Sequence, residues 1–281
     1  MKKYKQFNIY TTPYDPETLS GFLWELEIGG FLDNDTFATI FAGEKATINK
    51  SDVEEVLNRL VTDKFIESYS IEAEEHEEQN WNEEWEKNLN IIKVSDKIVI
   101  RPSTKEYTKV ADEIVITIDP KMSFGTGEHE TTKLVLSLLD KYNIKNGRVL
   151  DVGSGTAVLA IASVLLGADS AIALDNDEWC HLNGNENTLL NGVQDKIEVV
   201  LGELKDIKEE NFDLILANIN KPILLDINEL ILQKVKLGGI VILSGLLIID
   251  EEDILAAYEK LGFSVVEKRT MNEWMGLVLR G

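Results

Sequence analysis

The chain has 281 residues, which is enough for two domains, and its 28 basic and 50 acidic side chains leave a formal net charge of −22. Nucleic acid is bound through lysine and arginine, so this balance argues against direct nucleic-acid binding and favours a basic partner, although acidity also serves solubility alone. The single cysteine, Cys180, excludes an intrachain disulfide and suits the cytoplasm. Neither an apolar leader nor 18 consecutive apolar residues occur, so no membrane span is expected.

Residues 1–72 are predicted to form a small ferredoxin-like α/β domain, because helices and strands alternate within a short segment. Gly29-Gly30 would end the first helix. Ser51 and Glu54 have the spacing of a capping box at the start of the second helix. The expected elements are strands over 7–10, 36–41 and 66–71, with helices that start at Asp15 and Ser51.

Residues 73–96 are rich in glutamate and are predicted to form a linker helix. Trp81 and Trp85 lie four positions apart and would share one helical face. Two interpretations stay open. One is a solvated connecting helix with one face docked on a domain, and the other is an interdomain hinge that presents negative charge to a basic substrate.

Residues 97–281 contain short apolar strands without alternation, which is typical of a parallel sheet covered by helices on both faces. Strands and helices alternate here, so we predict a doubly wound, mostly parallel, seven-stranded sheet. A short turn over 269–273 separates the last two strands, which predicts an antiparallel edge. The expected strands cover 148–152, 171–175, 196–200, 212–217, 239–244, 263–268 and 275–280, and the expected helices 156–166, 178–190, 223–234 and 250–260.

The most informative segment is the run Leu150 to Ile161, which has the pattern of a buried strand, a glycine turn and the start of a helix. Glycine lets the backbone approach a ligand closely, and an acid at the end of the next strand can bind the hydroxyls of a ribose. Gly153, Gly155 and Asp175 therefore indicate a cofactor that contains a nucleoside. A purely structural glycine turn is the alternative.

The glycine pattern also limits the kind of cofactor. A dinucleotide turn needs a third glycine, where this chain has Val158, and the Gly-Lys-Ser/Thr run of a phosphate loop is absent. A ribose site without phosphate-binding elements predicts S-adenosylmethionine, a nucleoside that carries an amino acid. Main-chain amides of the turn would hold its carboxylate, Asp151 would orient its ammonium and Asp175 would bind its ribose.

The segment Phe124 to Thr132 contains two glycines and leads into a helix expected to begin at Lys133. Thr131 and Thr132 are candidate caps of this helix, and a helix amino terminus with hydroxyls also suits a carboxylate. His129 is a candidate general base, with a structural hydrogen bond as the alternative. No cluster of histidine, cysteine and carboxylate side chains has metal-ligand spacing, so no metal is expected.

Asn218 follows an apolar strand and is expected beside the cofactor, at the same ends of the strands as Asp151 and Asp175. Its amide oxygen can accept a hydrogen bond from an amine and so aim the lone pair of that amine at a methyl group. The alternative is a turn residue that caps the next helix, and Asn220 has the same two interpretations. Trp274, at the start of the last strand, would either pack on the sheet edge or form a wall of the substrate channel.

Together these residues make the chain similar to the PrmA family, the methyltransferases of large-subunit ribosomal protein eleven, in its Bacteroidetes-like branch. The resemblance implies an N-terminal domain that grips the substrate protein, a linker, and a Rossmann-like class I methyltransferase domain. It places cofactor contacts at Thr132, Gly153, Asp175 and Asn218. The most similar segments are Asn80–Glu86, Asp119–Thr132, Leu150–Ile161, Asp175–Val193, Ala217–Leu225, Ser244-Gly245 and Gly262–Leu279.

The resemblance also implies the reaction. A cytoplasmic monomer would transfer methyl groups to lysine side chains of that basic ribosomal protein, with an N-terminal amine as a further target. Two departures from the family pattern, Ser154 for cysteine and Ala157 for glycine, are both small residues. Two other functions stay open here: methylation of another protein or a small amine, and a non-catalytic cofactor-binding scaffold.

Overall fold

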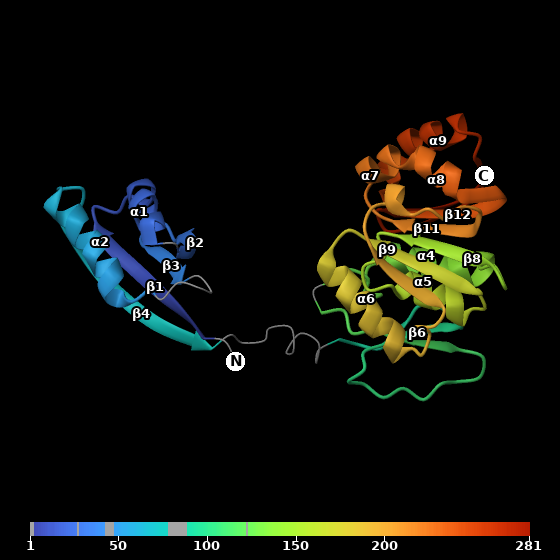
Figure 1. The fold of residues 1–281 in the computed structure, drawn as a ribbon, viewed down its shortest axis with the longest axis horizontal. Coiled ribbons are helices and arrows are strands. Elements are labelled where there is room, and N and C mark those ends of the chain that lie inside the picture. Colours follow the sequence, from blue (N-terminus) through green and yellow to red (C-terminus); the bar gives the residue numbers. More distant parts are fainter. Residues whose placement is uncertain (1–2, 27, 43–47, 78–88, 122) are drawn as a thin grey trace. The chain divides into compact units, whose positions relative to one another are not determined.

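The computed structural model describes residues 3–26, 28–42, 48–77, 89–121 and 123–281. The chain divides into two compact units, residues 1–81 and 82–281. Figure 1 labels many of the helices and strands of both units. Within the described ranges, no helix is both long and apolar enough to cross a membrane.

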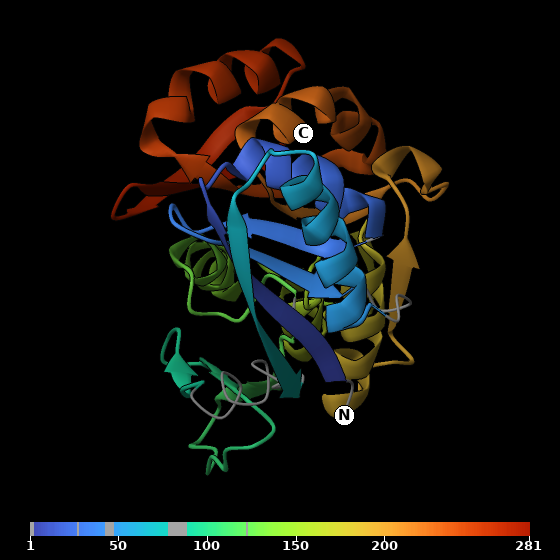
Figure 2. The same cartoon turned by 90° about the vertical axis from the view of Figure 1, so that its left-hand side faces the viewer.

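The first unit is a four-stranded antiparallel sheet with two helices on one face, as Figure 2 shows. Its elements are β1 (Lys3–Thr12), α1 (Pro16–Leu23), β2 (Ile28–Asp33), β3 (Ala38–Ala42), α2 (Lys50–Thr62) and β4 (Ser68–Glu77). The strand order β2-β3-β1-β4 and this sequence of elements are those of a ferredoxin-like fold, which confirms the prediction. Phe7, Ile40 and Leu57 lie in its apolar core.

The pair Gly29-Gly30, which was expected to end the first helix, lies within β2. Helix α1 already ends at Leu23, and a 3₁₀ turn follows over Trp24–Leu26. The pairing of β2 with β3 is irregular between Ile28 and Gly30. Glycine inside a strand commonly marks such an irregularity, so these two glycines bend a strand and do not stop a helix.

The second helix of this unit begins earlier than the predicted capping box requires. Helix α2 starts at Lys50, and Asn49 is its N-cap. The backbone N–H of Asn49 donates to the Asp52 carboxylate at 2.7 Å, which closes the box three residues further on. The Ser51–Glu54 pairing was therefore wrong, because Ser51 already lies inside the first helical turn.

Strand β4 continues to Glu77 and pairs with β1 along its whole length. Residues 73–77 thus belong to this sheet and not to the linker helix predicted over 73–96. The strand is longer than its apolar pattern indicates because β1 offers ten residues of partner backbone. The predicted tryptophan face of the linker, Trp81 and Trp85, lies outside the described residues.

The second unit is built on a seven-stranded sheet flanked by helices. Its elements after residue 147 are β8 (Arg148–Val152), α5 (Val158–Leu165), β9 (Ser170–Asp175), α6 (Glu178–Leu190), β10 (Ile197–Leu201), β11 (Phe212–Asn218), α7 (Lys221–Asp226), α8 (Asn228–Lys234), β12 (Val235–Leu247), α9 (Glu251–Lys260), β13 (Ser264–Met271) and β14 (Trp274–Arg280). The strand order is β10-β9-β8-β11-β12-β14-β13. The first five strands are parallel and β14 is antiparallel to both of its neighbours, so the doubly wound sheet and its antiparallel edge are confirmed.

Two apolar cores cover the two faces of this sheet. Helices α4 (Glu130–Tyr142) and α5 contribute to one core, and α7, α8 and α9 contribute to the other. The single helix predicted over 223–234 is two helices, which meet at Ile227. The bend lets Leu224 and Ile231 both enter the second core without any exposed surface.

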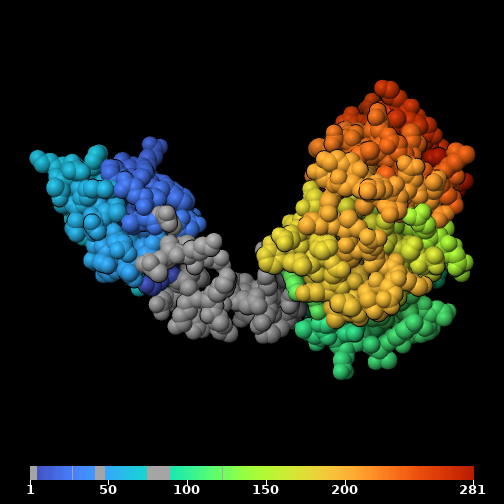
Figure 3. All heavy atoms as spheres, viewed as in Figure 1, coloured from blue at the N-terminus to red at the C-terminus, as the bar shows by residue number. Residues whose placement is uncertain are grey.

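A small sheet precedes the main one in the chain. It consists of β5 (Ile92–Lys93), β6 (Ile98–Arg101) and β7 (Ile114–Thr117). Figures 1 and 3 show this green segment at one end of the second unit, with α9 at the other end. Ile98, Ile100 and Ile116 join the core that holds α4 and α5, so the small sheet extends that core.

Candidate active site

The carboxyl ends of the parallel strands β8, β9 and β11 meet at one edge of the sheet. A pocket of about 460 Å³ opens there, which we call the carboxyl-edge pocket. Gly153, Asp175 and Ile219 are among its lining residues. In open α/β sheets ligands bind outside the carboxyl ends of the strands, so this pocket lies where the sequence pattern predicted the cofactor.

The turn after β8 requires glycine at two positions. Gly153 and Gly155 have φ angles of +72° and +53°, which lie in the left-handed region. A Cβ on Gly155 would stand 2.2 Å from the carbonyl oxygen of Phe124, and a Cβ on Gly153 would stand 2.3 Å from the Ile219 side chain. Ala157 also has a positive φ of 62° and so carries backbone strain.

The main-chain amides of this turn are engaged within the protein. The N–H groups of Gly153 and Ser154 donate to the Leu174 carbonyl, that of Thr156 to the Phe124 carbonyl and that of Ala157 to the Ser154 carbonyl. The Gly155 N–H donates to Asp175. Each amide N–H has a single strong hydrogen bond to give, so these contacts argue against the prediction that the turn amides hold the cofactor carboxylate.

Asp151 lies at the end of β8 and has no exposed surface. Its Oδ2 accepts a hydrogen bond from the Ala160 backbone N–H at 3.1 Å, but among the described residues its Oδ1 has no hydrogen-bond partner. Burial raises the pKa of Asp151 to about 7, and the charge of Asp175 adds to that rise. A buried acid with one free oxygen suits a cationic partner, which would supply the missing hydrogen bond.

Asp175 ends β9 and faces the carboxyl-edge pocket. Its Oδ2 accepts from the Gly155 N–H at 2.8 Å and its Oδ1 from the Asp177 N–H at 3.0 Å. The two bonds hold the carboxylate in a fixed orientation, and each oxygen keeps a further lone pair for a ligand. This geometry is compatible with the predicted ribose contact, which stays a prediction.

The loop before α4 is fastened to the glycine turn. The Thr156 hydroxyl donates to the Gly125 carbonyl at 2.8 Å, in addition to the backbone bond from Thr156 to Phe124. Gly125 has a φ of +108°, and a Cβ there would stand 2.6 Å from the Thr156 hydroxyl. The loop and the turn therefore pack backbone to backbone beside the pocket.

Helix α4 begins at Glu130, three residues before the expected start, and His129 is its N-cap. The Nδ1 atom of His129 accepts from the Thr131 N–H at 3.3 Å and lies 2.8 Å from the Thr131 hydroxyl. The predicted cap at Thr131 or Thr132 was therefore wrong. The structural interpretation of His129 is supported, because the ring nitrogen that faces the protein is already an acceptor.

Asn218 ends β11, and its side chain approaches α4. Its Nδ2 donates weakly to the buried Thr132 hydroxyl at 3.5 Å, while its Oδ1 is buried and has no hydrogen-bond partner within the part of the chain that the structure describes. Asn220 differs, because its side chain accepts from the Ile223 N–H and caps α7. The structure thus separates the two asparagines into a free acceptor at the strand end and a helix cap.

Trp274 joins a row of aromatic rings at the same edge. Its ring lies 4.9 Å from the His129 ring at 66°, and His129 lies 5.3 Å from Phe124 at 63°. Both contacts are edge-to-face arrangements, which are the favoured ones for aromatic pairs. Trp274 therefore packs against the N-cap of α4 and is not confined to the outer edge of the sheet.

A ladder of asparagines on α6 was missed by sequence reasoning. Asn191 exchanges two hydrogen bonds with the backbone of Thr117, and Asn187 and Asn183 bond the backbone of Asp119. Asn187 also donates to the Thr156 carbonyl at 3.1 Å. The spacing of four residues between these asparagines was a signal that one helical face is polar and buried.

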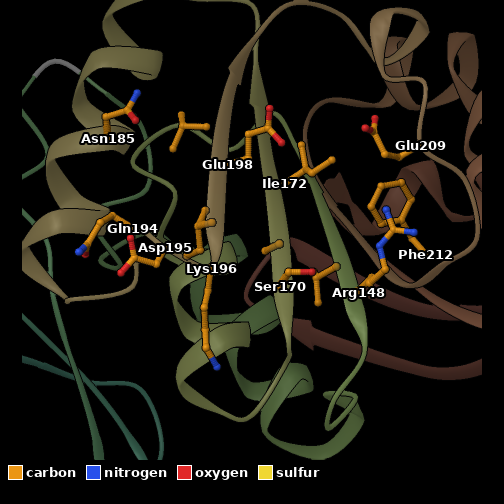
Figure 4. A pocket seen from close by; sticks show the side chains of 14 residues that line it. Arg148, Ser170, Ile172, Asn185, Gln194, Asp195, Lys196, Glu198, Glu209 and Phe212 are labelled. Carbon is orange, nitrogen blue, oxygen red and sulfur yellow. The ribbon is translucent and has the colours of Figure 1, made fainter.

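A second pocket lies at the opposite edge of the sheet, where the parallel strands begin. This pocket of about 530 Å³, the amino-edge pocket, is shown in Figure 4. Arg148, Ser170 and Lys196 are at or next to the first residues of their strands. None of the residues predicted to bind cofactor lines it. Among the described residues, no group of three histidine, cysteine or acidic side chains could hold a metal ion.

The doubly wound sheet with its antiparallel last strands, together with a nucleoside-type turn that has no phosphate loop, defines the class I methyltransferases. The family model described as ribosomal protein L11 methyltransferase (PrmA) matches residues 35–281. The chain therefore belongs to the ribosomal protein L11 methyltransferase family.

Individual relatives agree with this assignment. The ribosomal protein L11 methyltransferase of Brevibacillus brevis is 32% identical over 99% of both chains, and that of Porphyromonas gingivalis is 37% identical over 95% of this chain and 90% of its own length. The crystal structure of the ribosomal protein L11 methylase from Lactobacillus delbrueckii subsp. bulgaricus has a TM-score of 0.64 at 32% identity, and covers 68% of this chain and 98% of that one.

Proposed function

We propose that this enzyme transfers methyl groups from S-adenosylmethionine to lysine side chains of ribosomal protein L11, with the N-terminal amine as a further target. The observation that carries the proposal is the buried Oδ1 of Asn218, an acceptor without a partner at the carboxyl edge of the sheet. The relatives named above, which carry L11 in their names, support the choice of acceptor. A ribosomal protein as substrate would place the reaction in the cytoplasm.

The residues present suit S-adenosylmethionine, which supplies a methyl group on an electrophilic sulfonium when bound. Asp151 would accept the cofactor ammonium on its free Oδ1, and Asp175 would accept the ribose hydroxyls. Because the turn amides are engaged, we assign the cofactor carboxylate to the amino terminus of α4, where Thr132 lies. Gly153 and Gly155 leave the room that a side chain would fill.

Asn218 would hold the acceptor amine. A free lysine has a pKa of ~10.4, so only about one in 10³ is neutral at pH 7. Asn218 is half-buried. A lysine amine beside it would be favoured in its neutral form, because burial penalises the charged form. The Asn218 Oδ1 would accept a hydrogen bond from this amine and so fix the direction of its lone pair, which is a proximity and orientation effect.

The structure contains little that would serve as a dedicated base at this point. The Nδ1 of His129 already accepts hydrogen bonds from Thr131, so we propose that His129 orients α4 and Trp274 and does not abstract a proton. The amine proton would leave to water. Phe124 and Trp274, on either side of His129, would form the wall along which the lysine side chain enters.

The test is methyl transfer to purified ribosomal protein L11 with S-adenosylmethionine that carries a deuterated methyl group. Intact-mass and peptide mass spectrometry should show deuterated methyl groups on lysines of L11 and none on a panel of other basic ribosomal proteins. Transfer to a different protein, or to a small amine, would reassign the acceptor. Cofactor binding without transfer to any acceptor would favour the scaffold interpretation.

A further inference from the structure

Large apolar side chains stand exposed at the carboxyl edge of the main sheet, next to a half-buried tryptophan. We use the term lip for Phe124, Trp274, Ile248 and Ile249. Phe124 is 54% exposed, Ile248 41% and Ile249 84%. An isolated exposed apolar residue is ordinary, but a contiguous group beside a reactive site marks an interaction surface.

The members of the lip are connected. Phe124 and Trp274 are joined through the His129 ring, which contacts both. Trp274 pairs with Leu247 across β14 and β12, and the next residue, Ile248, donates its backbone N–H to the Glu273 carbonyl at 2.9 Å. The lip thus runs from the loop over the cofactor turn to the turn that follows β12.

Unpaired carboxylates border the lip. Glu128 precedes His129, Glu273 precedes Trp274, and Glu252 lies three residues after Ile249. All three are exposed, and in the described part of the chain their side chains have no hydrogen bond or ion pair. Free acidic groups around an apolar patch favour a basic partner with an apolar area of its own, through both contact and long-range attraction.

We infer that the lip is the docking surface of the catalytic unit for the basic protein whose lysine is methylated; the inference rests on the proposed function. The lip and Asn218 meet at the start of α4, because Trp274 contacts His129 and Asn218 contacts Thr132, so a protein seated on the lip would place an adjacent lysine near Asn218. A second copy of this chain is the less suitable occupant, because its net charge of −22 would bring unpaired acids against unpaired acids.

The experiment compares two exposed apolar residues at opposite ends of the same strand. Ile249→Ser removes a lip residue just after β12, whereas Leu237→Ser removes a side chain that is 96% exposed near the start of β12. The Kd of the full-length enzyme for ribosomal protein L11 is measured calorimetrically with S-adenosylhomocysteine present, so that no turnover occurs. A Glu252→Gln/Glu273→Gln double variant is measured at two salt concentrations.

We expect Ile249→Ser to weaken L11 binding at least fivefold and Leu237→Ser to change it less than twofold. The double glutamine variant should bind more weakly and lose part of the salt dependence. Equal Kd values for the two serine variants, or no measurable L11 binding, would overturn the docking surface. So would a change of sedimentation mass in Ile249→Ser at unaltered Kd, which would assign the lip to a second copy.

Failure of the proposed reaction gives a different result. If L11 binds and Ile249→Ser weakens that binding, the docking surface stands even when mass spectrometry finds no methyl group on L11. That result would overturn only the proposed methyl transfer to L11.

Discussion

The two ends of the main sheet each have a hollow of similar size, about 460 Å³ at the carboxyl edge and about 530 Å³ at the amino edge (Figure 4). Their chemistry differs. At the amino edge the Arg148 guanidinium lies 5.0 Å from the Phe212 ring centre and donates to the Glu210 carbonyl. At the carboxyl edge, Asp151, Ser154 and Asn218 each have a buried polar atom without a partner.

This difference teaches that volume is a poor marker of a ligand site. Folding leaves few buried polar atoms without a hydrogen bond, since each costs free energy. Among the described residues, the side chains with such atoms line neither pocket, but Asp151 and Asn218 stand near the carboxyl ends of their strands and Ser154 lies in the turn after β8. Unmet hydrogen bonding gathers around the carboxyl ends of β8 and β11, where a ligand would complete it. In the described part of the chain Asn143, in the loop before β8, also has a buried amide oxygen without a partner. Each prediction below changes one edge and uses a control elsewhere.

The largest effect is expected from Gly155→Ala. The new methyl group would meet the Phe124 carbonyl, so the turn must move, which should weaken cofactor binding more than 100-fold and lower the free energy of unfolding by about 3 kcal/mol. Gly192→Ala is the matched control, because its φ of +66° is similar but nothing lies within 4 Å. It should cost about 1 kcal/mol and leave cofactor binding unchanged. Calorimetry and denaturant unfolding measure both, and equal losses in the two variants would contradict the role of the turn.

Asn218→Ala should lower kcat about 100-fold, because the amine loses the acceptor that orients it. The Kd for S-adenosylmethionine should change less than tenfold. Asn185→Ala, in the lining of the amino-edge pocket, should leave kcat unaltered. The readout is the initial rate at saturating cofactor and L11. An unaltered rate in Asn218→Ala would remove this residue from the mechanism.

The affinity for S-adenosylmethionine should depend on pH through Asp151. Its pKa is raised to about 7 in the cofactor-free protein, and the cofactor ammonium requires the ionised form. Affinity should therefore rise with pH and level off above about 7, falling by up to about tenfold per pH unit below it. Asp151→Asn should flatten this profile, and Glu198→Gln at the amino-edge pocket should not. The affinity is measured by calorimetry between about pH 5.5 and 8, a range that spans the raised pKa.

The same pKa predicts a stability profile. An acid whose folded pKa lies above its unfolded value binds its proton more tightly in the folded state. Its contribution is therefore fully present below the unfolded pKa, near 3.8, and is lost as the pH rises through about 7. Urea unfolding of the cofactor-free enzyme should show this loss, and Asp151→Asn should show less of it.

The smallest effect is expected from Ala157→Gly. Relief of the left-handed strain at φ 62° is partly offset by the greater freedom of glycine in the unfolded chain, so a gain below about 1 kcal/mol is expected. Ala256→Gly, on the exposed face of α9, should instead lose about 1 kcal/mol. Thermal unfolding of the two variants measures the contrast. Losses in both would show that the turn stores no relievable strain.

The sequence predicted most of the second unit because its strands are short apolar runs and its turns are marked by glycine. The ranges 148–152 and 178–190 match β8 and α6 residue for residue. The start of α4 was misplaced because histidine is an unusual N-cap, whereas the threonines after it are common ones. The glycines of β2 were misread because glycine serves both helix ends and irregular strands.

The sequence allowed the site residues to be named, but it did not predict the hydrogen-bond partners of the turn. Asp151, Asp175 and Asn218 could be named because each is the last or second-last residue of an apolar strand. That the turn amides bond to Leu174, Phe124 and Asp175 depends on chain segments brought together only by folding. Spacing cannot reveal which acceptor an amide reaches, and for this reason we propose the amino terminus of α4, and not the turn, as the site of the cofactor carboxylate.

The asparagine ladder has a consequence for how this enzyme can adapt. The main chain at Thr117 and Asp119, which pairs with β6 on one side only, is held on its other side by two asparagines of α6 and the asparagine that caps its end. A neighbouring strand would hold this segment through backbone amides, which side-chain substitutions do not remove. Asparagine side chains, in contrast, can be replaced one at a time. The hydrogen bonding of the segment that leads into the loop beside the glycine turn can therefore change in small steps without any change in the sheet.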